Sequence, residues 1–167
     1  MLTMAIRYYI LGIVINRNMK GNSQMARLYL AYGSNLNKEQ MAFRCPTARP
    51  IGAFTLYGYE LVFRGVADIV HTGSDQSQIQ LGMWEIEKAD EKALDRYEGV
   101  KHGMYSKIEI CGMLTYQMNT TDMYPPSTDY FNTILKGYHD FGLDTSHLYD
   151  AVGWSHHYDT FDFAYSV

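Results

Sequence analysis

Two places in the sequence carry groups suited to chemistry, and the first is the run Tyr32-Gly33-Ser34-Asn35. It lies between an apolar stretch and a helix start predicted at Asn37. Backbone N–H groups at such a turn are unpaired, and the helix dipole favours negative charge there. Gly33 lets a ligand approach the backbone, while Ser34 and Asn35 add small polar side chains. The run therefore suits a carboxylate or an oxyanion, although an ordinary strand-to-helix connection has the same local pattern.

The second place is Glu98, in the last turn of a helix predicted over residues 88–100. The helix dipole disfavours an anion at that end, and Asp95 adds a like charge on nearly the same face. Burial of Glu98 would act in the same direction, so that its pKa is expected to rise towards neutrality. Such a carboxyl group can serve as both general base and general acid. An exposed Glu98 would instead be an ordinary surface residue.

Other reactive residue types form no comparable pattern. His156 and His157 are adjacent and cannot share a helix face, and Cys45 and Cys111 have neither metal-type nor disulfide spacing. The sequence therefore predicts no metal site and two cysteines that behave as small buried apolar residues.

Composition bounds the class of protein. With 167 residues, 47% of them hydrophobic, the chain can bury one sizeable core. A net charge of −4 and scattered Lys and Arg argue against nucleic acid as a partner. The apolar run at residues 8–15 is too short to span a membrane and no cleavage site follows it, so we expect a cytoplasmic protein with no membrane partner.

The N-terminal region is expected to be separate from the core. Residues 16–24 read as a polar linker, and Met25 directly precedes the first strong strand. We therefore predict an extension or arm over residues 1–24 and a single domain over residues 25–167.

In the first half of that domain, a strand is predicted at residues 28–32, followed by a helix that Asn37 caps. Gln40 completes a capping-box pattern, and the helix should end at Cys45 because Pro46 follows. Residues 53–63 are β-rich and interrupted by Gly58. Residues 65–72 and 78–86 resemble a hairpin around a polar loop.

In the second half, the helix over residues 88–100 should end at Gly99, and residues 104–118 return to strand. A helix then follows Pro125 and Pro126, capped by Ser127 or Thr128 and ended by Gly142, with a second short helix starting near residue 145 or 146. We predict an α+β fold built on a closed or strongly bent sheet.

Several stretches together resemble the γ-glutamylcyclotransferase family, which shares its fold with AIG2-like proteins. The matching stretches are YGSNLN (32–37), RCPTA (44–48), GYELVFRGVADI (58–69), LGMWEI (81–86), LDRYEGVKHGMYSKIEI (94–110) and PPSTDYFNTILKGYHDFGL (125–143). The resemblance covers about residues 28–152, and the order of these motifs is more specific than any one of them.

The resemblance implies a small mixed β-barrel with flanking helices, and an enzyme that converts a γ-glutamyl amide into 5-oxoproline and a free amine without metal or cofactor. By position, Glu98 matches the catalytic glutamate of the family. The residues implied to bind the glutamyl group are Tyr32, Gly33, Ser34, Asn35, Leu36 and Tyr105.

Three matters stay open at the level of sequence. The leaving group can be an amino acid, another amine, or an intermediate that carries a γ-glutamyl protecting group. The same pocket can also belong to a protein that binds an anionic small molecule without turning it over. The motifs leave open a homodimer as well.

Overall fold

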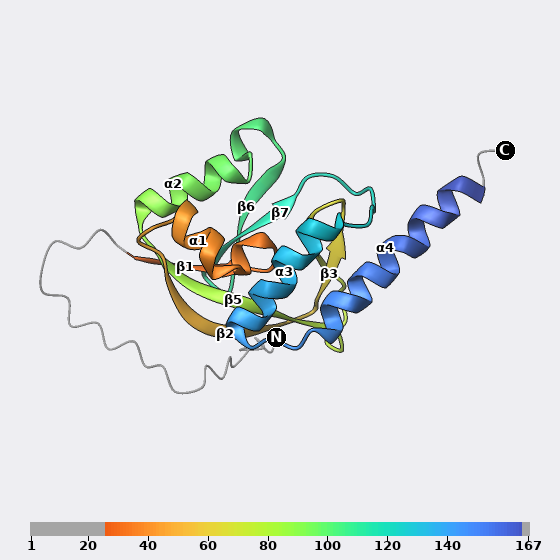
Figure 1. Ribbon diagram of the computed structural model, residues 1–167, viewed down its shortest axis with the longest axis horizontal. Coiled ribbons are helices and arrows are strands. Elements are labelled where there is room, and N and C mark those ends of the chain that lie inside the picture. Colours follow the sequence, from red (N-terminus) through yellow and green to blue (C-terminus); the bar gives the residue numbers. More distant parts are fainter. Residues whose placement is uncertain (1–25, 165–167) are drawn as a thin grey trace, which may run out of the picture.

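The computed structural model describes residues 26–164 of the chain, and their side chains as far as residue 156. The arm predicted for residues 1–24 lies outside the described residues. In chain order (Figure 1) the elements are β1 (Arg27–Ala31), η1 (Ser34–Leu36), α1 (Lys38–Arg44), β2 (Arg49–Tyr57), β3 (Tyr59–Phe63), β4 (Ala67–His71), β5 (Gln78–Ile86), α2 (Lys88–Tyr97), η2 (Val100–His102), β6 (Tyr105–Ile110), β7 (Met113–Met118), α3 (Thr128–Phe141) and α4 (Ser146–Ala164).

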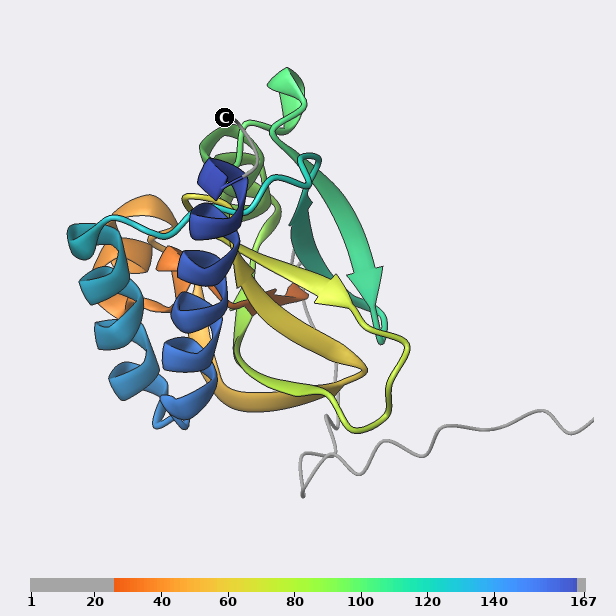
Figure 2. The ribbon, with the colours of Figure 1, turned by 90° about the vertical axis from the view of Figure 1, so that its right-hand side faces the viewer.

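The strands form a five-stranded sheet and a separate two-stranded ribbon. The sheet has the order β2-β5-β1-β7-β6, and the ribbon pairs β3 with β4. The sheet is mixed because β1 runs antiparallel to β5 but parallel to β7. The sheet is strongly curled (Figure 2), but within the described residues its edge strands β2 and β6 do not pair with each other. The predicted α+β class is confirmed, and the word barrel describes the sheet only loosely.

The predicted hairpin of residues 65–72 with residues 78–86 is wrong. β4 pairs with β3 across a tight turn at Gly65, which has φ of 77° and lies next to a backbone hydrogen bond from Arg64 N–H to the Val66 carbonyl. β5 instead pairs with both β2 and β1. Leu81 to Trp84 are all buried, so β5 has the pattern of a central strand that needs a neighbour on each side.

Residues 104–118 form two strands rather than one. β6 and β7 make an antiparallel hairpin whose turn contains Cys111 and Gly112, with φ of 55° and 73°. Two successive residues in the left-handed backbone conformation give a turn whose twist matches that of the two paired strands. Cys111 is therefore exposed, contrary to the prediction, whereas Cys45 is buried as expected.

The helix boundaries follow the predicted capping residues. The Asn37 side chain caps α1 by accepting hydrogen bonds from the amides of Glu39 and Gln40. The other half of the expected capping box is not formed, because the Gln40 side chain accepts from Arg44 instead. At the other end of the domain, Ser127 caps α3.

The ends of the helices also agree with the sequence, except for α4. Glu98 directly follows Tyr97, the last residue of α2, and precedes Gly99 in the left-handed conformation. Gly142, also left-handed, ends α3. α4 begins at Ser146 as expected but is longer than the short helix predicted.

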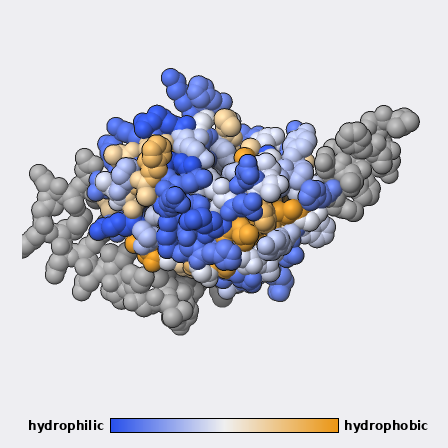
Figure 3. All heavy atoms as spheres, viewed as in Figure 1, coloured by the Kyte–Doolittle hydropathy of each residue, from blue (hydrophilic) through white to orange (hydrophobic). Residues whose placement is uncertain are grey.

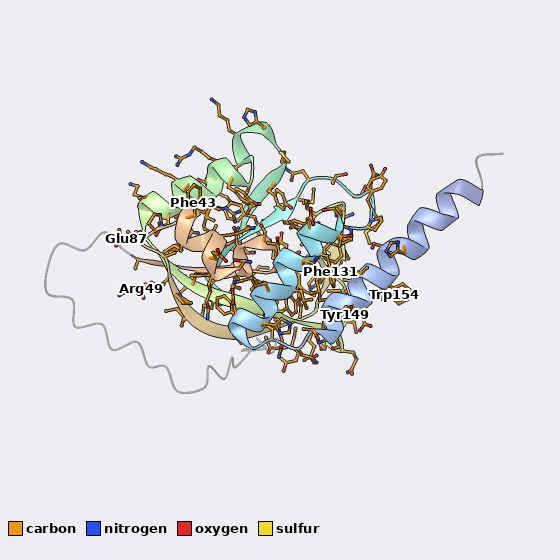
Figure 4. All side chains as sticks on the ribbon, in the orientation of Figure 1. Phe43, Arg49, Glu87, Phe131, Tyr149 and Trp154 are labelled. Atoms are coloured by element: carbon orange, nitrogen blue, oxygen red, sulfur yellow. The ribbon has the colours of Figure 1, made fainter. Side chains whose placement is uncertain are left out.

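Helices α3 and α4 lie side by side (Figure 2) and pack on η1 and on β3 respectively. Phe131 of α3 and Tyr149 of α4 face each other (Figure 4), with ring centroids 5.5 Å apart. Apolar residues show in a seam between these two helices on an otherwise largely hydrophilic face (Figure 3). Among the helices described, none has the length and apolar character needed to span a bilayer.

Candidate active site

A cavity of about 260 Å³ opens where the end of β1, η1 and the C-terminal end of α2 meet β4, β6, β7 and α3. Its walls are mostly aromatic or apolar, and the lining residues are Tyr29, Tyr32, Gly33, Ser34, Asn35, Val66, Ala67, Tyr97, Glu98, Met104, Tyr105, Tyr116 and Tyr130. The cavity thus brings together both places that the sequence singles out. The described residues hold no cluster of three or more His, Cys, Asp or Glu side chains that would bind a metal ion.

The segment from Tyr32 to Asn35 is fixed from behind by bonds to the sheet. The Tyr32 hydroxyl donates a hydrogen bond of 2.7 Å to the Tyr116 carbonyl, and Trp84 Nε1 donates one of 3.1 Å to the Asn35 carbonyl. At Gly33, a Cβ atom would lie 3.1 Å from the Tyr130 hydroxyl. A side chain larger than hydrogen would therefore enter the cavity space.

The start of α1 does not supply the anion site expected from the sequence. Its first amides already have partners: Asn37 Oδ1 accepts from Glu39 and Gln40, and Asp140 Oδ2 accepts from the Lys38 amide at 2.9 Å. The short helix η1 inserts a turn between the strand and α1, which moves the N-terminus of α1 away from residues 33–35. The 33–35 segment thus presents its own groups to the cavity, without the dipole of α1.

Leu36 does not line the cavity, although the resemblance groups it with the binding segment. Its side chain is fully buried, and Cβ atoms built on Gly82 and Gly137 would lie 2.6 Å and 2.4 Å from it. Leu36 thus packs between β5 and α3, and its role is to anchor η1.

Glu98 is half-buried at the C-terminal end of α2, and its Oε1 accepts a hydrogen bond of 2.7 Å from Asn35 Nδ2. Burial raises the pKa of Glu98 to about 7, although the Asn35 hydrogen bond and the Arg44 charge act in the opposite direction. The expected rise in pKa is therefore present. The prediction that the charge of Asp95 also raises this pKa is wrong, because Asp95 is not among the groups that shift it. The Asp95 carboxylate instead accepts hydrogen bonds from Tyr116 Oη and Lys107 Nζ.

Asn35 is the hub of the polar contacts in the cavity and is itself buried. Its Nδ2 donates to Glu98 and, at 2.8 Å, to the Tyr29 hydroxyl. Its Oδ1 accepts from Nη1 of Arg44. The amide thus uses donors and acceptor at once, and it holds the carboxylate of Glu98 in one place.

Tyr105 lines the cavity from β6, and its hydroxyl donates a hydrogen bond of 3.1 Å to the Ala67 carbonyl. Burial holds its pKa well above the ordinary value for tyrosine, as it does for the tyrosines at positions 29, 32, 116 and 130. These five phenols stay neutral near pH 7, whereas the pKa of Glu98 lies in that range.

Sequence reasoning missed several members of the site. Tyr130 lies four and eight residues before Ile134 and Tyr138, so its place on the inward face of α3 was visible from helical spacing. Arg44 and Tyr97 lie within the matched motifs, but nothing in their local sequence indicates that the Arg44 guanidinium stacks 3.4 Å from the centre of the Tyr97 ring.

Comparison with known proteins identifies the family and agrees with this fold. Residues 79–149 match the model of the AIG2-like family. The chain is 31% identical over 137 residues to the γ-glutamylcyclotransferase of Bos taurus, covering 70% of this chain and 72% of that protein. It is 29% identical over 148 residues to the γ-glutamylcyclotransferase of Homo sapiens, covering 76% and 78%.

A solved structure of a γ-glutamyl cyclotransferase superposes with a TM-score of 0.68 at 27% identity, and the match covers 76% of this chain and 86% of that one. The chain belongs to the γ-glutamylcyclotransferase family, a family of enzymes.

Proposed function

We propose that the protein is a γ-glutamylcyclotransferase that releases 5-oxoproline and a free amine from a γ-glutamyl amide, with Glu98 as general base and then general acid. The observation that carries the proposal is a half-buried carboxyl group with a pKa of about 7, held by Asn35 in a cavity that also contains Gly33 and Ser34. A group that is about half ionised near neutral pH can take up a proton and return it.

The substrate's glutamyl group occupies the cavity, with its α-carboxylate against Gly33, Ser34 and Asn35 and its α-amine towards Glu98. Tyr32 and Tyr105 contribute shape and exclude water, because their hydroxyl protons already bond to the carbonyls of Tyr116 and Ala67. The attacking and attacked atoms belong to one molecule. The protein therefore mainly selects the ring-closing conformer, and orientation of this kind is worth roughly 7–11 kcal/mol.

Ring closure follows in two steps. The carboxylate of Glu98 removes a proton from the substrate's ammonium group, and the resulting amine attacks the γ-carbonyl carbon to form a tetrahedral oxyanion. The oxyanion collapses, the bond to the leaving nitrogen breaks, and the carboxyl group of Glu98 returns its proton to that nitrogen. The Glu98 carboxylate then removes the second proton from the ring nitrogen and passes it to the released amine, which leaves as an ammonium ion. Donors of the 33–35 segment stabilise the oxyanion, and one well-placed donor contributes about 2.7–4 kcal/mol.

The test is release of 5-oxoproline from a panel of γ-glutamyl amino acids and amines by the protein and by Glu98→Gln. The variant keeps the size and hydrogen-bonding capacity of the side chain but cannot take up the proton. Turnover should fall by about 10²–10⁴-fold while binding measured by calorimetry persists. Glu39→Gln is a matched control, because Glu39 is 83% exposed on α1 and should leave turnover unchanged.

A Glu98→Gln protein with full turnover contradicts the mechanism. Binding of γ-glutamyl compounds without release of 5-oxoproline by the unaltered protein would instead identify a small-molecule-binding protein.

A further inference from the structure

Arg44, the last residue of α1, contacts the site without being part of the mechanism above. Its Nη1 donates to Asn35 Oδ1, and its Nη2 donates to Gln40 Oε1 at 3.0 Å. The face of its guanidinium lies 3.4 Å from the centre of the Tyr97 ring. The neighbouring Phe43, which is 92% exposed, marks this end of α1 in Figure 4. The half-buried arginine is therefore held on three sides.

These contacts determine which way the Asn35 amide faces. A side-chain amide can flip, which exchanges its acceptor oxygen for its donor nitrogen. On the cavity side, the Tyr29 hydroxyl and a protonated Glu98 can each donate or accept, so neither selects one orientation in every protonation state. Arginine has only donors and stays charged, so Arg44 can bond to Asn35 only when the amide presents its Oδ1 atom to the guanidinium. The Asn35 Nδ2 group is thereby turned towards Glu98.

Arg44 also acts on Glu98 through its charge, which lowers the pKa of the carboxyl group against the effect of burial. Burial keeps neutral the phenols around Glu98 that come from β1 and the residue after it, β6, β7 and α3, namely Tyr29, Tyr32, Tyr105, Tyr116 and Tyr130. Tyr97 of α2 lines the same cavity. The nearby acids have their own partners: Asp68 pairs with Arg64, and Asp95 pairs with Lys107.

The third contact connects Arg44 to the rim of the cavity. Tyr97 lines the cavity, and its hydroxyl lies 3.2 Å from Ser34 Oγ within hydrogen-bonding distance. A guanidinium stacked on the ring face adds cation–π attraction of about 0.5–2 kcal/mol. One arginine thus fixes Asn35 from one side and Tyr97 from the other.

We propose that Arg44 is a positioning residue for Glu98, which it holds, through the Asn35 amide, in the orientation that accepts the proton of the substrate's amine. The proposal rests on the proposed function for its catalytic consequence. The orientation itself exists without substrate, so it can be tested apart from turnover.

The first measurement is the titration of Glu98 without substrate, followed by the carboxyl ¹³C chemical shift in glutamate-labelled protein. Arg44→Met keeps the aliphatic stem over Tyr97 but removes the charge and the donors. We expect the pKa of Glu98 to rise above its value in the unaltered protein, because both the charge and the fixed Asn35 hydrogen bond are lost. Arg44→Lys keeps the charge but lacks the planar guanidinium that donates to Asn35 and Gln40 together, and it should shift the pKa of Glu98 less.

The second measurement is the pH dependence of 5-oxoproline release. A rise of one pKa unit from about 7 reduces the ionised fraction of Glu98 at pH 7 by about fivefold. We therefore expect kcat of Arg44→Met to fall by about that factor at pH 7, with KM little changed, and to recover at higher pH. Arg49→Gln is the control, because Arg49 (Figure 4) pairs with Glu85 at the surface and should leave the profile unchanged.

An unchanged Glu98 titration in folded Arg44→Met overturns the proposal, and so does a loss of kcat by the same factor at every pH. If Arg44→Met does not fold, Arg44→Lys decides by the same two criteria. If the unaltered protein releases no 5-oxoproline, the proposed function fails, while the ¹³C titration still decides whether Arg44 orients Asn35.

Discussion

At Glu98, burial and polar contacts act in opposite directions on one carboxyl group. Removal from water raises its pKa, and the Asn35 hydrogen bond and the Arg44 charge lower it, with burial the larger effect. With stronger hydrogen bonds, the carboxyl group would stay ionised near pH 7 and would be a poor acid. Buried without partners, it would stay protonated and would be a poor base. The balance at about 7 is what suits this residue to both proton transfers.

The same balance predicts a stability that depends on pH. The folded state holds the Glu98 proton more tightly than the unfolded chain, so stability falls as pH rises from the ordinary value of 4.5 to about 7. Glu98→Gln removes the free-energy cost of burying the ionised carboxylate. The variant should therefore be more stable than the unaltered protein at pH 8, by on the order of 2 kcal/mol, but not at pH 4. Urea unfolding at the two pH values measures the difference. Equal stabilities at pH 8 would mean that the carboxylate is well solvated.

A second prediction about a single residue concerns Gly33. A Cβ atom there would lie 3.1 Å from the Tyr130 hydroxyl and 3.3 Å from the Ala67 Cβ, and valine adds two methyl groups. Gly33→Val should therefore weaken binding of a γ-glutamyl ligand by at least about tenfold, as followed by calorimetry. Adding Tyr130→Phe should restore part of the affinity. Unchanged affinity in Gly33→Val would place the ligand elsewhere.

Among the elements, α3 determines where the binding segment sits, because η1 lies directly against it. At Gly137 a Cβ atom would lie 2.4 Å from Leu36 Cβ and 2.8 Å from the Asn37 amide nitrogen. The helix and η1 can approach this closely only with glycine at the contact. The backbone of α3 thus sets the position of η1.

Gly137→Ala should therefore destabilise the protein by about 1–3 kcal/mol and reduce turnover, since η1 must move away. Gly153→Ala is the matched control on α4, where a Cβ atom would meet nothing within 4 Å. It should stabilise the fold slightly, by up to about 1 kcal/mol, because alanine favours a helix over glycine. Chemical denaturation of both variants tests the pair, and equal effects would contradict the close packing of α3 on η1.

For the whole molecule, the position of the β3–β4 ribbon relative to the sheet decides whether the cavity has a wall. Val66 and Ala67 of this region line the cavity. Asp68, which is 1% exposed, accepts from Arg64 Nε at 2.8 Å and from the Met118 amide of β7 at 3.0 Å. The buried Asp68 carboxylate therefore pairs with Arg64 at the turn of the ribbon and also joins the ribbon to β7 of the sheet.

Arg64→Met leaves the Asp68 carboxylate buried without its cation and should cost about 3–5 kcal/mol of stability. Adding Asp68→Asn removes the stranded charge while keeping an acceptor for the Met118 amide, so the double variant should recover part of the loss. The measurement is urea unfolding of the single and double variants. A single variant as stable as the unaltered protein would show that the pair does not hold the ribbon in place.

Much of this protein follows from local sequence. The caps Asn37 and Ser127 and the stops Gly99 and Gly142 mark helix ends correctly, because capping depends on groups within a few residues. The family resemblance also names Glu98 and the 32–35 run as parts of one site, because motif order survives where overall identity is low.

The tertiary structure alone decided strand pairing and the contacts around Glu98. β5 joins β2 and β1 rather than β4, because a strand with both faces buried needs neighbours that local alternation does not identify. Asn35 reaches Glu98 across 63 positions of chain, and Arg44 reaches both through the amide that it orients. Residue types and order thus name a carboxyl group able to transfer protons. Its pKa depends on burial and on partners distant in sequence, which only the folded chain brings together.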